Sequence, residues 1–135
     1  MATAGRFRNQ ADLITATLKR LGVLATGQAQ DPDDTANVTE ELDSIFRTLN
    51  DLEICSIPDP NNFPGQWFAP LADIVAGECA SKFGTSPDEY RRLKLAGLGL
   101  PKPDGEGPGS GAAAKAIKAM TRGRPTFERL RVEYF

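Results

Sequence analysis

The sequence predicts an all-α protein, a small bundle of about four helices with a Pro-rich loop and an extended C-terminal tail. Apolar residues recur at helical spacing in four separate segments, and residues with capping preferences stand at the ends of these segments. The 135 residues, 40% hydrophobic and 25% charged, suit one ordinary globular domain. No apolar run is long enough to span a bilayer, and the N-terminus lacks the apolar core of a secretory signal.

The first helix is predicted over residues 10–21, QADLITATLKRL. Its apolar face is formed by Leu13, Ile14, Thr17, Leu18 and Leu21. Lys19 and Arg20 lie in the last turn, where cations suit the helix dipole, and Gly22 suits the position after the helix end.

The second helix is predicted to be the longest. Asp33 or Asp34 would cap its start, and it would end near residue 54. Its apolar face is formed by Val38, Leu42, Ile45, Phe46, Leu49 and Leu52. Its polar face carries Glu40, Glu41, Asp43 and Asp51.

Residues 55–70, CSIPDPNNFPGQWFAP, are too rich in proline for a regular helix or a central strand. Phe63, Trp67 and Phe68 nevertheless give this loop a large apolar area, so we expect it to fold back on the body or to contact a partner. For Trp67 and Phe68, a core or interface anchor is favoured over a ligand-binding box.

A third helix is predicted over 69–83, and a fourth begins with Ser86 as N-cap and Pro87 as first residue and runs to Ala96. Six glycines and three prolines in 97–111 predict a linker. The expected organisation is a helical body over 1–96, this linker, and a short helix with a C-terminal docking tail over 112–135.

Charge is unevenly distributed, although the net charge is only −2. Residues 31–59 hold nine acidic side chains against Arg47, and residues 113–135 hold six basic side chains against Glu128 and Glu133. Blocks of opposite sign favour contact with other charged surfaces or with a second copy, although a solvated helix face and a basic tail would give the same pattern.

The sequence offers little for catalysis or metal binding. It has no histidine, and Cys55 and Cys79 are expected to be buried thiols rather than a disulfide. Glu40 and Asp43 could share a catalytic site, but such pairs are routine on solvated helices. DPDD lacks the calcium-loop pattern, and GEGPGSGAAAK lacks the phosphate-loop spacing. We therefore expect no enzyme activity, cofactor or metal.

Nucleic-acid binding is one alternative function. Basic residues gather in two places, with Arg91, Arg92 and Lys94 in one and Lys115, Lys118, Arg122 and Arg124 in the other. The acidic balance, with a pI near 5.2, argues against a surface that binds duplex DNA.

The order of these segments resembles the head–tail adaptors of tailed phages, also known as head-completion or tail accessory factors. The resemblance covers about residues 10–95. It consists of the opening ADLITATLKRLGV, the acidic loop, the long helix VTEELDSIFRTLNDLEI, the Ala-rich FAPLADIVAGECASKFG and the start SPDEYRRL. Family members tend to continue the late helix, whereas residues 97–111 interrupt it here.

The resemblance implies a non-enzymatic protein of the virion head–tail interface, assembled in the host cytoplasm. Such adaptors form a ring, commonly dodecameric, beneath the portal protein. They extend the DNA channel without sequence-specific binding, help retain the genome and provide a platform for a downstream tail or stopper protein. A cellular helical interaction module and a small nucleic-acid-binding protein remain the alternatives.

The resemblance also implies that the C-terminal segment docks on the portal. The residues expected to do so are Arg124, Phe127, Leu130, Arg131, Val132, Tyr134 and Phe135. Phe63, Trp67 and Phe68 are candidates for contact with the phage tail or with a neighbouring copy of the chain. Glu40, Glu41, Asp43 and Asp51 are candidates for lining the channel, and a face turned to solvent is the equal alternative.

Overall fold

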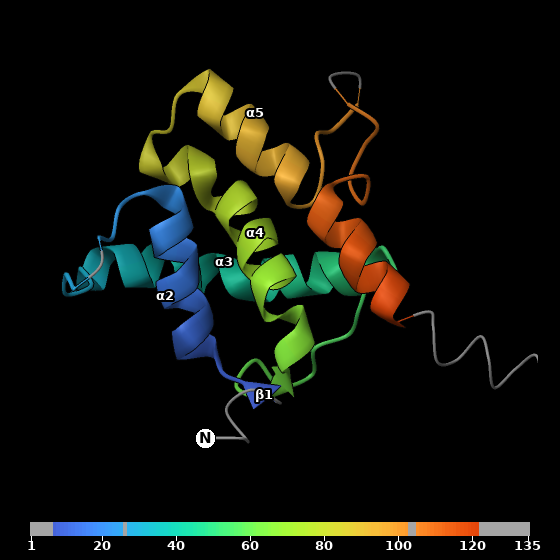
Figure 1. The fold of residues 1–135 in the computed structure, drawn as a ribbon, viewed down its shortest axis with the longest axis horizontal. Helices are drawn as coiled ribbons and strands as arrows, with labels where there is room; N and C mark the ends of the chain where they lie inside the picture. Colours follow the sequence, from blue (N-terminus) through green and yellow to red (C-terminus); the bar gives the residue numbers. More distant parts are fainter. Residues whose placement is uncertain (1–6, 26, 103–104, 122–135) are drawn as a thin grey trace, which may run out of the picture.

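The computed structural model describes residues 7–25, 27–102 and 105–121 (Figure 1). Within them the chain is mainly helical, so the predicted all-α class is confirmed. The elements in chain order are β1 (Phe7–Arg8), α2 (Gln10–Leu21), α3 (Pro32–Asp51), β2 (Phe63–Pro64), the 3₁₀ helix η1 (Gly65–Trp67), α4 (Phe68–Cys79), the 3₁₀ helix η2 (Ala80–Phe83) and α5 (Pro87–Ala96). A further helix covers residues 112–121.

Helix α4 forms the centre of the bundle, and α2, α3 and α5 all pack against it (Figure 1). Its buried residues are Leu71, Ala72, Ile74, Val75, Ala76, Gly77 and Cys79. A helix that is apolar on nearly every side has to be covered on nearly every side. Small residues bring the neighbours close: a Cβ added at Gly77 would lie 2.9 Å from the carbonyl oxygen of Leu93 on α5.

Helix α2 has the boundaries that its sequence predicts. The Asn9 side chain caps its start by accepting a hydrogen bond of 2.9 Å from the Asp12 N–H. Gly22 takes the left-handed conformation with φ 79°, and the next N–H, that of Val23, donates to the Leu18 carbonyl. Because an ion pair of 2.7 Å joins Arg20 to Asp73, α2 is also tied to α4 by charge.

Helix α3 begins and ends earlier than predicted. Asp31, rather than Asp33 or Asp34, is the cap and accepts the Asp33 N–H at 2.9 Å. Pro32 then occupies the first position, where its missing N–H costs nothing. The helix closes at Asp51 because Glu53, at φ 59°, turns the chain through the left-handed region, and the Ile54 N–H donates to the Leu49 carbonyl at 3.0 Å.

Replacing Glu53 by glycine is expected to stabilise the fold by about 0.5–1 kcal/mol. The left-handed conformation costs a non-glycine residue about 1–2 kcal/mol, and the greater freedom of glycine in the unfolded chain offsets part of that gain. Urea unfolding followed by the fluorescence of the single tryptophan, Trp67, measures the change. Glu53→Ala is the control because it removes the carboxylate and keeps the strain. A glycine variant no more stable than the alanine variant would contradict the prediction.

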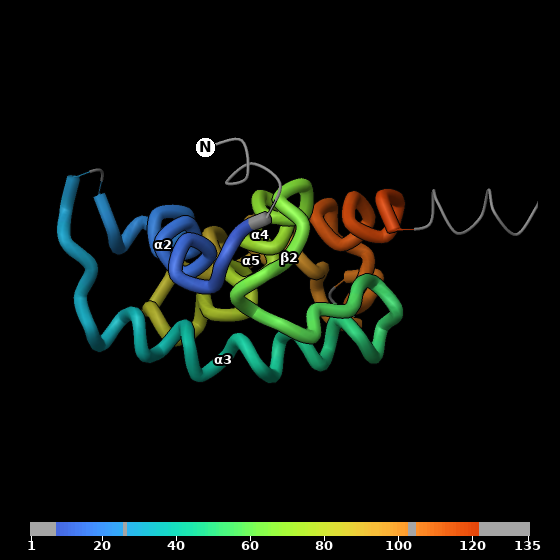
Figure 2. The backbone as a smooth tube through the Cα atoms, turned by 90° about the horizontal axis from the view of Figure 1, so that it is seen from below, coloured from blue at the N-terminus to red at the C-terminus, as the bar shows by residue number. Residues whose placement is uncertain are grey.

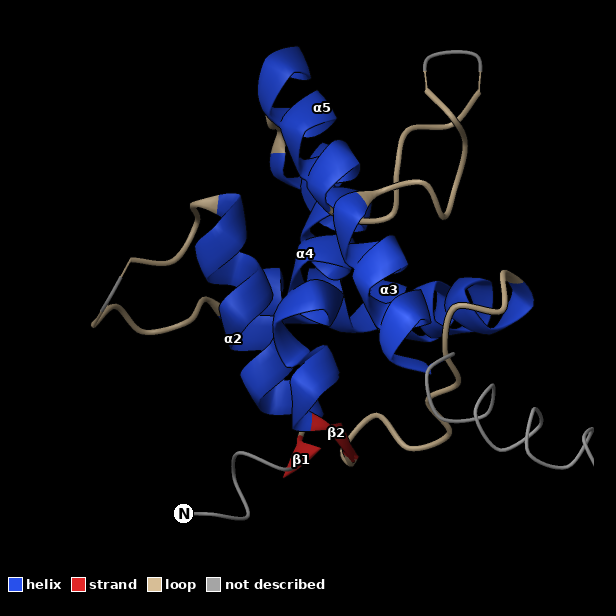
Figure 3. Ribbon diagram, turned by 45° about the vertical axis from the view of Figure 1, so that its right-hand side comes forward, coloured by secondary structure: helices blue, strands red, loops and turns tan. Residues whose placement is uncertain are grey.

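A short antiparallel ribbon joins the Pro-rich loop to the N-terminal segment (Figure 3). In it, Arg8 pairs with Phe63 and Phe7 with Pro64. The Arg8 guanidinium also lies 3.7 Å from the centroid of the Phe68 ring, a cation–π contact. The loop therefore folds back on the body, the first of the two outcomes that its composition predicts.

The segment 97–111, predicted as a linker, is a compact loop in its described part. The N–H groups of Gly109 and Gly111 both donate to the Leu98 carbonyl, at 2.7 and 3.0 Å, and the Ala114 N–H donates to the Gly97 carbonyl at 3.2 Å. Leu98 is 3% exposed. The two ends of the segment therefore meet, as in an Ω-loop.

Helix 112–121 belongs to the same core as the preceding helices. Ala113, Ala114 and Ile117 are buried in one cluster with residues of α2, α3 and α4. Residues 97–102 and 105–121 therefore pack with the helical body, whereas the sequence predicted a linker followed by a separate short helix. Composition suggested flexibility because it cannot distinguish glycines of a mobile chain from glycines that permit close backbone contact.

Candidate partner-binding site

The outer face of α3 is the acidic surface that the sequence singled out. This face comprises Asp33, Ala36, Glu40, Asp43, Ser44, Arg47 and Asp51, which lie opposite the buried Val38, Leu42, Ile45 and Leu49. Helix α3 lies along one edge of the molecule, with the other elements on its inner side (Figure 2). The side chains of Glu40 and Asp43 are 70% and 77% exposed.

The four predicted channel-lining acids divide into two groups. Glu40, Asp43 and Asp51 lie on the outer face, whereas Glu41 is half-buried at its flank. Lys82 of η2 approaches Glu41 at 2.9 Å and Glu40 at 3.7 Å, and the hydrogen bond from Lys82 to Glu41 raises the pKa of that lysine. Glu41 thus ties η2 to α3, and its side chain is less exposed than those of the other three acids.

The predicted aromatic contact residues also divide. Phe63 is 1% exposed, so its ring lies in the core and the expected contact with a neighbour is corrected for this residue. Sequence could not show this, because Phe63 becomes buried only when the loop folds back. Trp67 and Phe68 are half-buried and pack on the core, so only part of each ring remains for a partner.

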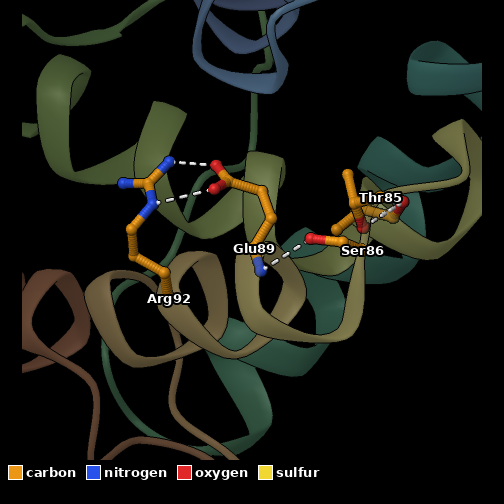
Figure 4. Close-up of polar contacts among 5 residues, drawn as sticks. Thr85, Ser86, Glu89 and Arg92 are labelled. Atoms are coloured by element: carbon orange, nitrogen blue, oxygen red, sulfur yellow. Dashed lines mark hydrogen bonds and ion pairs between the residues drawn. The ribbon is translucent and has the colours of Figure 1, made fainter.

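Most of the basic residues on α5 are already paired. Lys94 is buried and makes an ion pair with Glu78 of α4. Arg92 forms an ion pair with Glu89, which raises the pKa of Arg92 and lowers that of Glu89 (Figure 4). Within the described chain, Arg91 is the one basic side chain of α5 with no carboxylate in ion-pair distance. Helix α5 therefore presents little free positive charge to DNA phosphates.

The same view shows how α5 begins. The Ser86 hydroxyl accepts a hydrogen bond of 3.2 Å from the Glu89 N–H, and the Thr85 hydroxyl donates to the Ala80 carbonyl at 3.1 Å (Figure 4). The N-cap predicted for Ser86 is therefore confirmed, and it fixes the turn between η2 and α5.

A groove of about 330 Å³ lies where α2, α3 and the loop before β2 meet. Its lining consists of Gln10, Ala11, Ile14, Thr15, Gln30, Thr35, Thr39 and Asn61. Gln30 joins the two helices, because it hydrogen-bonds to the hydroxyls of Thr15 and Thr35. No sequence motif could reveal this groove, since its residues come from four separate segments.

The described residues contain no obvious catalytic or metal centre. No group of three or more His, Cys, Asp or Glu side chains in the described ranges is placed to hold a metal ion. Glu40 and Asp43 are both strongly exposed, and neither lines the groove. None of the described helices has the length and apolar composition needed to cross a membrane.

Cys55 and Cys79 are free and buried, as predicted. Burial raises the pKa of the Cys55 thiol from 9.0 to about 11 and that of Cys79 to about 12, with nearby Glu41 adding to the shift at Cys79. Unfolded thiols lose their protons near pH 9 while folded ones keep theirs. The thiols' contribution to stability is therefore complete below pH 9 and is lost as the pH rises toward 11 and 12.

Neither thiol is expected to react with iodoacetamide in the folded chain near pH 8. The raised pKa lowers the thiolate fraction at least about 100-fold, and burial blocks the reagent as well. Mass spectrometry of the alkylated protein measures the effect, and both thiols should react in urea. The matched control is Ser44→Cys, an exposed thiol on α3. Modification of either native thiol as fast as this one would contradict the prediction.

The seven residues predicted to dock on the portal, from Arg124 to Phe135, lie outside the described residues. The last described element before them is helix 112–121, which is anchored in the core by Ile117. No protein-family model, no curated protein and no solved structure matches the chain. A functional assignment therefore depends on the residue patterns and surfaces described above.

Proposed function

We propose that the chain is a structural head-to-tail adaptor of a tailed phage or a related particle. Its copies form a dodecameric ring beneath the portal protein, extend the DNA channel and help to retain the packaged genome. The ring gives a platform to the downstream tail or stopper protein. The chain acts without cofactor, catalysis or membrane contact, at the head–tail interface of the virion after assembly in the host cytoplasm.

The observation that carries the proposal is the order of the helix-face patterns that resemble this family. Each pattern lies on its own element: ADLITATLKRLGV on α2, VTEELDSIFRTLNDLEI on α3, FAPLADIVAGECASKFG on α4 and η2, and SPDEYRRL on α5. A single amphipathic helix is a weak signal, because many proteins contain one. Four in this order, separated by an acidic loop and a Pro-rich loop, are more specific.

In this proposal the outer face of α3 lines the channel. Its carboxylates would repel DNA phosphates that pass within about 10 Å, the range of charge interactions at moderate salt. A surface that repels DNA without reading its sequence suits a conduit. Lys94 and Arg92 on α5 are already in ion pairs, which supports this proposal over the nucleic-acid-binding alternative.

The C-terminal tail, residues 122–135, would dock on the portal. Phe127, Leu130, Val132, Tyr134 and Phe135 provide the apolar contacts, and the arginines pair with acidic groups. Alternating apolar residues in LRVEYF suit the addition of a strand to a partner sheet. Modest affinity of one tail becomes a stable joint when many copies bind at once.

A comparative pull-down from the native source tests the proposal. The full chain and a chain stopped after Gly123 serve as baits, bound proteins are identified by mass spectrometry, and recovered complexes are imaged by electron microscopy. The full chain is expected to recover a ring-forming protein of portal size, and the truncated chain is not. Recovery should persist at about 500 mM salt, whereas a nucleic-acid complex would weaken steeply.

Two outcomes would overturn parts of the proposal. If both baits recover the same ring, the helical body docks and the role of the tail is refuted. If neither recovers a virion protein, the adaptor assignment fails and a general interaction module becomes the leading account. Leu95→Ser is the matched control, because Leu95 is an apolar side chain on α5 that is 46% exposed and lies outside the tail. It should bind as the wild type does.

A further inference from the structure

The outer face of α3 is an unpartnered helix face in the described structure, and we infer that the C-terminal tail of the same chain docks on it while the protein is free. Helix α3 has 20 residues and is therefore about 30 Å long. Every described element that packs on α3 lies on its inner side (Figure 2). The face is thus one whole edge of the molecule and is open along its length.

The negative charge of this face favours binding of a positively charged segment. It carries four carboxylates and one cation, Arg47, which is paired with Asp43 at 3.0 Å, and Lys82 of η2 approaches Glu40 at 3.7 Å. Asp33 and Asp51 have no cation in ion-pair distance within the described residues. A helix C-terminus favours basic residues, because the carbonyl groups there are a centre of partial negative charge. Helix α3 has no basic residue in its last turn and carries Asp51 there instead. Positive charge from another segment would therefore stabilise the C-terminal end of α3.

The tail has the complementary charge and sufficient reach. Residues 122–135 hold four arginines against two glutamates, so the side chains of the tail are of opposite net charge to those of the face. Fourteen extended residues cover about 46 Å, which exceeds the length of α3. The tail follows helix 112–121, which lies at the same end of the molecule as the C-terminal end of α3 but on its inner side (Figures 1 and 2). The tail therefore reaches the outer face by passing around that end.

The same chain is favoured over a second copy as the source of the tail. A segment joined to its binding surface by a short stretch of chain has an effective concentration on the order of millimolar, far above that of another molecule in dilute solution. The docked tail would shield the carboxylates of the outer face and occupy the arginines that would otherwise pair with a partner. A partner that takes up the tail would then expose the acidic face in the same step.

The inference can be tested on the full chain alone by paramagnetic NMR. A nitroxide is attached to Ser44→Cys on the outer face, while the buried native thiols remain unlabelled. Amide signals of residues 124–135 are expected to broaden at about 50 mM salt and to recover at about 500 mM, because salt screens the charges. The same label at Leu95→Cys on α5 should leave those signals sharp. Sharp tail signals with the Ser44→Cys label at low salt would overturn the inference.

Charge variants in the labelled chain separate docking from chance proximity. Asp43→Asn/Asp51→Asn on the face is expected to remove most of the broadening. Asp88→Asn/Glu106→Gln makes the same change in net charge elsewhere on the chain and should leave the broadening unchanged. Arg129→Gln/Arg131→Gln in the tail should abolish the broadening without altering any residue of the helical body. Equal broadening in all of these variants would overturn the inference.

A mixed sample distinguishes the two sources of the tail. Isotope-labelled chain without nitroxide is combined with nitroxide-labelled chain of natural isotope content, and the tail signals are expected to stay sharp. Broadening in the mixture would assign the occupant to a second copy and refute docking within one chain. No partner is present in this experiment, so neither result bears on the adaptor proposal, which the pull-down tests separately.

Discussion

Gly111→Ala is expected to destabilise the fold by about 3 kcal/mol, as severe overpacking does, and to release helix 112–121 from the core. An added Cβ at Gly111 would lie 2.6 Å from the amide nitrogen of Gly99, closer than real Cβ atoms approach other atoms, and it would also collide with the Gly97 carbonyl. These neighbours are backbone atoms, so no side chain can move aside. Urea unfolding followed by Trp67 fluorescence gives the change in free energy, and hydrogen exchange shows whether residues 112–121 open first.

Gly109→Ala is the matched control for this prediction. Gly109 has nothing within 4 Å of an added Cβ, but its φ of 96° is one that side chains rarely adopt. Gly109→Ala should therefore lose about 1–2 kcal/mol of stability, from the strained backbone conformation alone. A smaller loss at Gly111 than at Gly109 would show that residues 97–111 are a loose linker after all, as composition alone suggests.

Phe63→Ala is expected to cost about 3–5 kcal/mol of stability, the usual range for removing a buried aromatic ring. Phe63 is 1% exposed and lies in β2, where it is paired with Arg8 of the N-terminal segment. Loss of the ring leaves a cavity under the Pro-rich loop and weakens its attachment to the body. Chemical unfolding of the variant and the wild type measures the loss.

Phe68→Ala provides the comparison, since Phe68 is half-buried and its ring also carries the contact with Arg8. We expect a loss of about 1–2 kcal/mol from the smaller buried area and the cation–π contact together. If Phe63→Ala proved as mild as Phe68→Ala, the ring would not be a core anchor, and contact with a neighbouring copy would again be the better account of Phe63.

The helices were predictable because each depends on a local pattern. The apolar face of α2, the cap at Ser86 and the glycine at position 22 are all short-range features, and the structure bears them out. The errors at the ends of α3 have local causes as well. Pro32 moves the cap back to Asp31, and the left-handed Glu53 closes the helix at a residue that is not glycine, which sequence patterns seldom anticipate.

The candidate surfaces were only partly predictable. The outer face of α3 follows from helical periodicity, so Glu40, Asp43 and Asp51 are where the pattern places them. Glu41 differs because Lys82, far away in the sequence, folds beside it. Pairing of Lys94 with Glu78 and of Arg92 with Glu89 likewise removes cations that the sequence alone presents as free.

By itself, the sequence determined the helical class, the order and faces of four helices, and the acidic and basic blocks at opposite parts of the chain. These properties depend on residues a few positions apart, whose geometry the helix dictates. Only the tertiary structure decided that Phe63 is core, that residues 97–111 are a packed loop and that helix 112–121 belongs to the body. Each of these depends on which backbone atoms of distant segments come within contact distance, and composition carries no record of that distance.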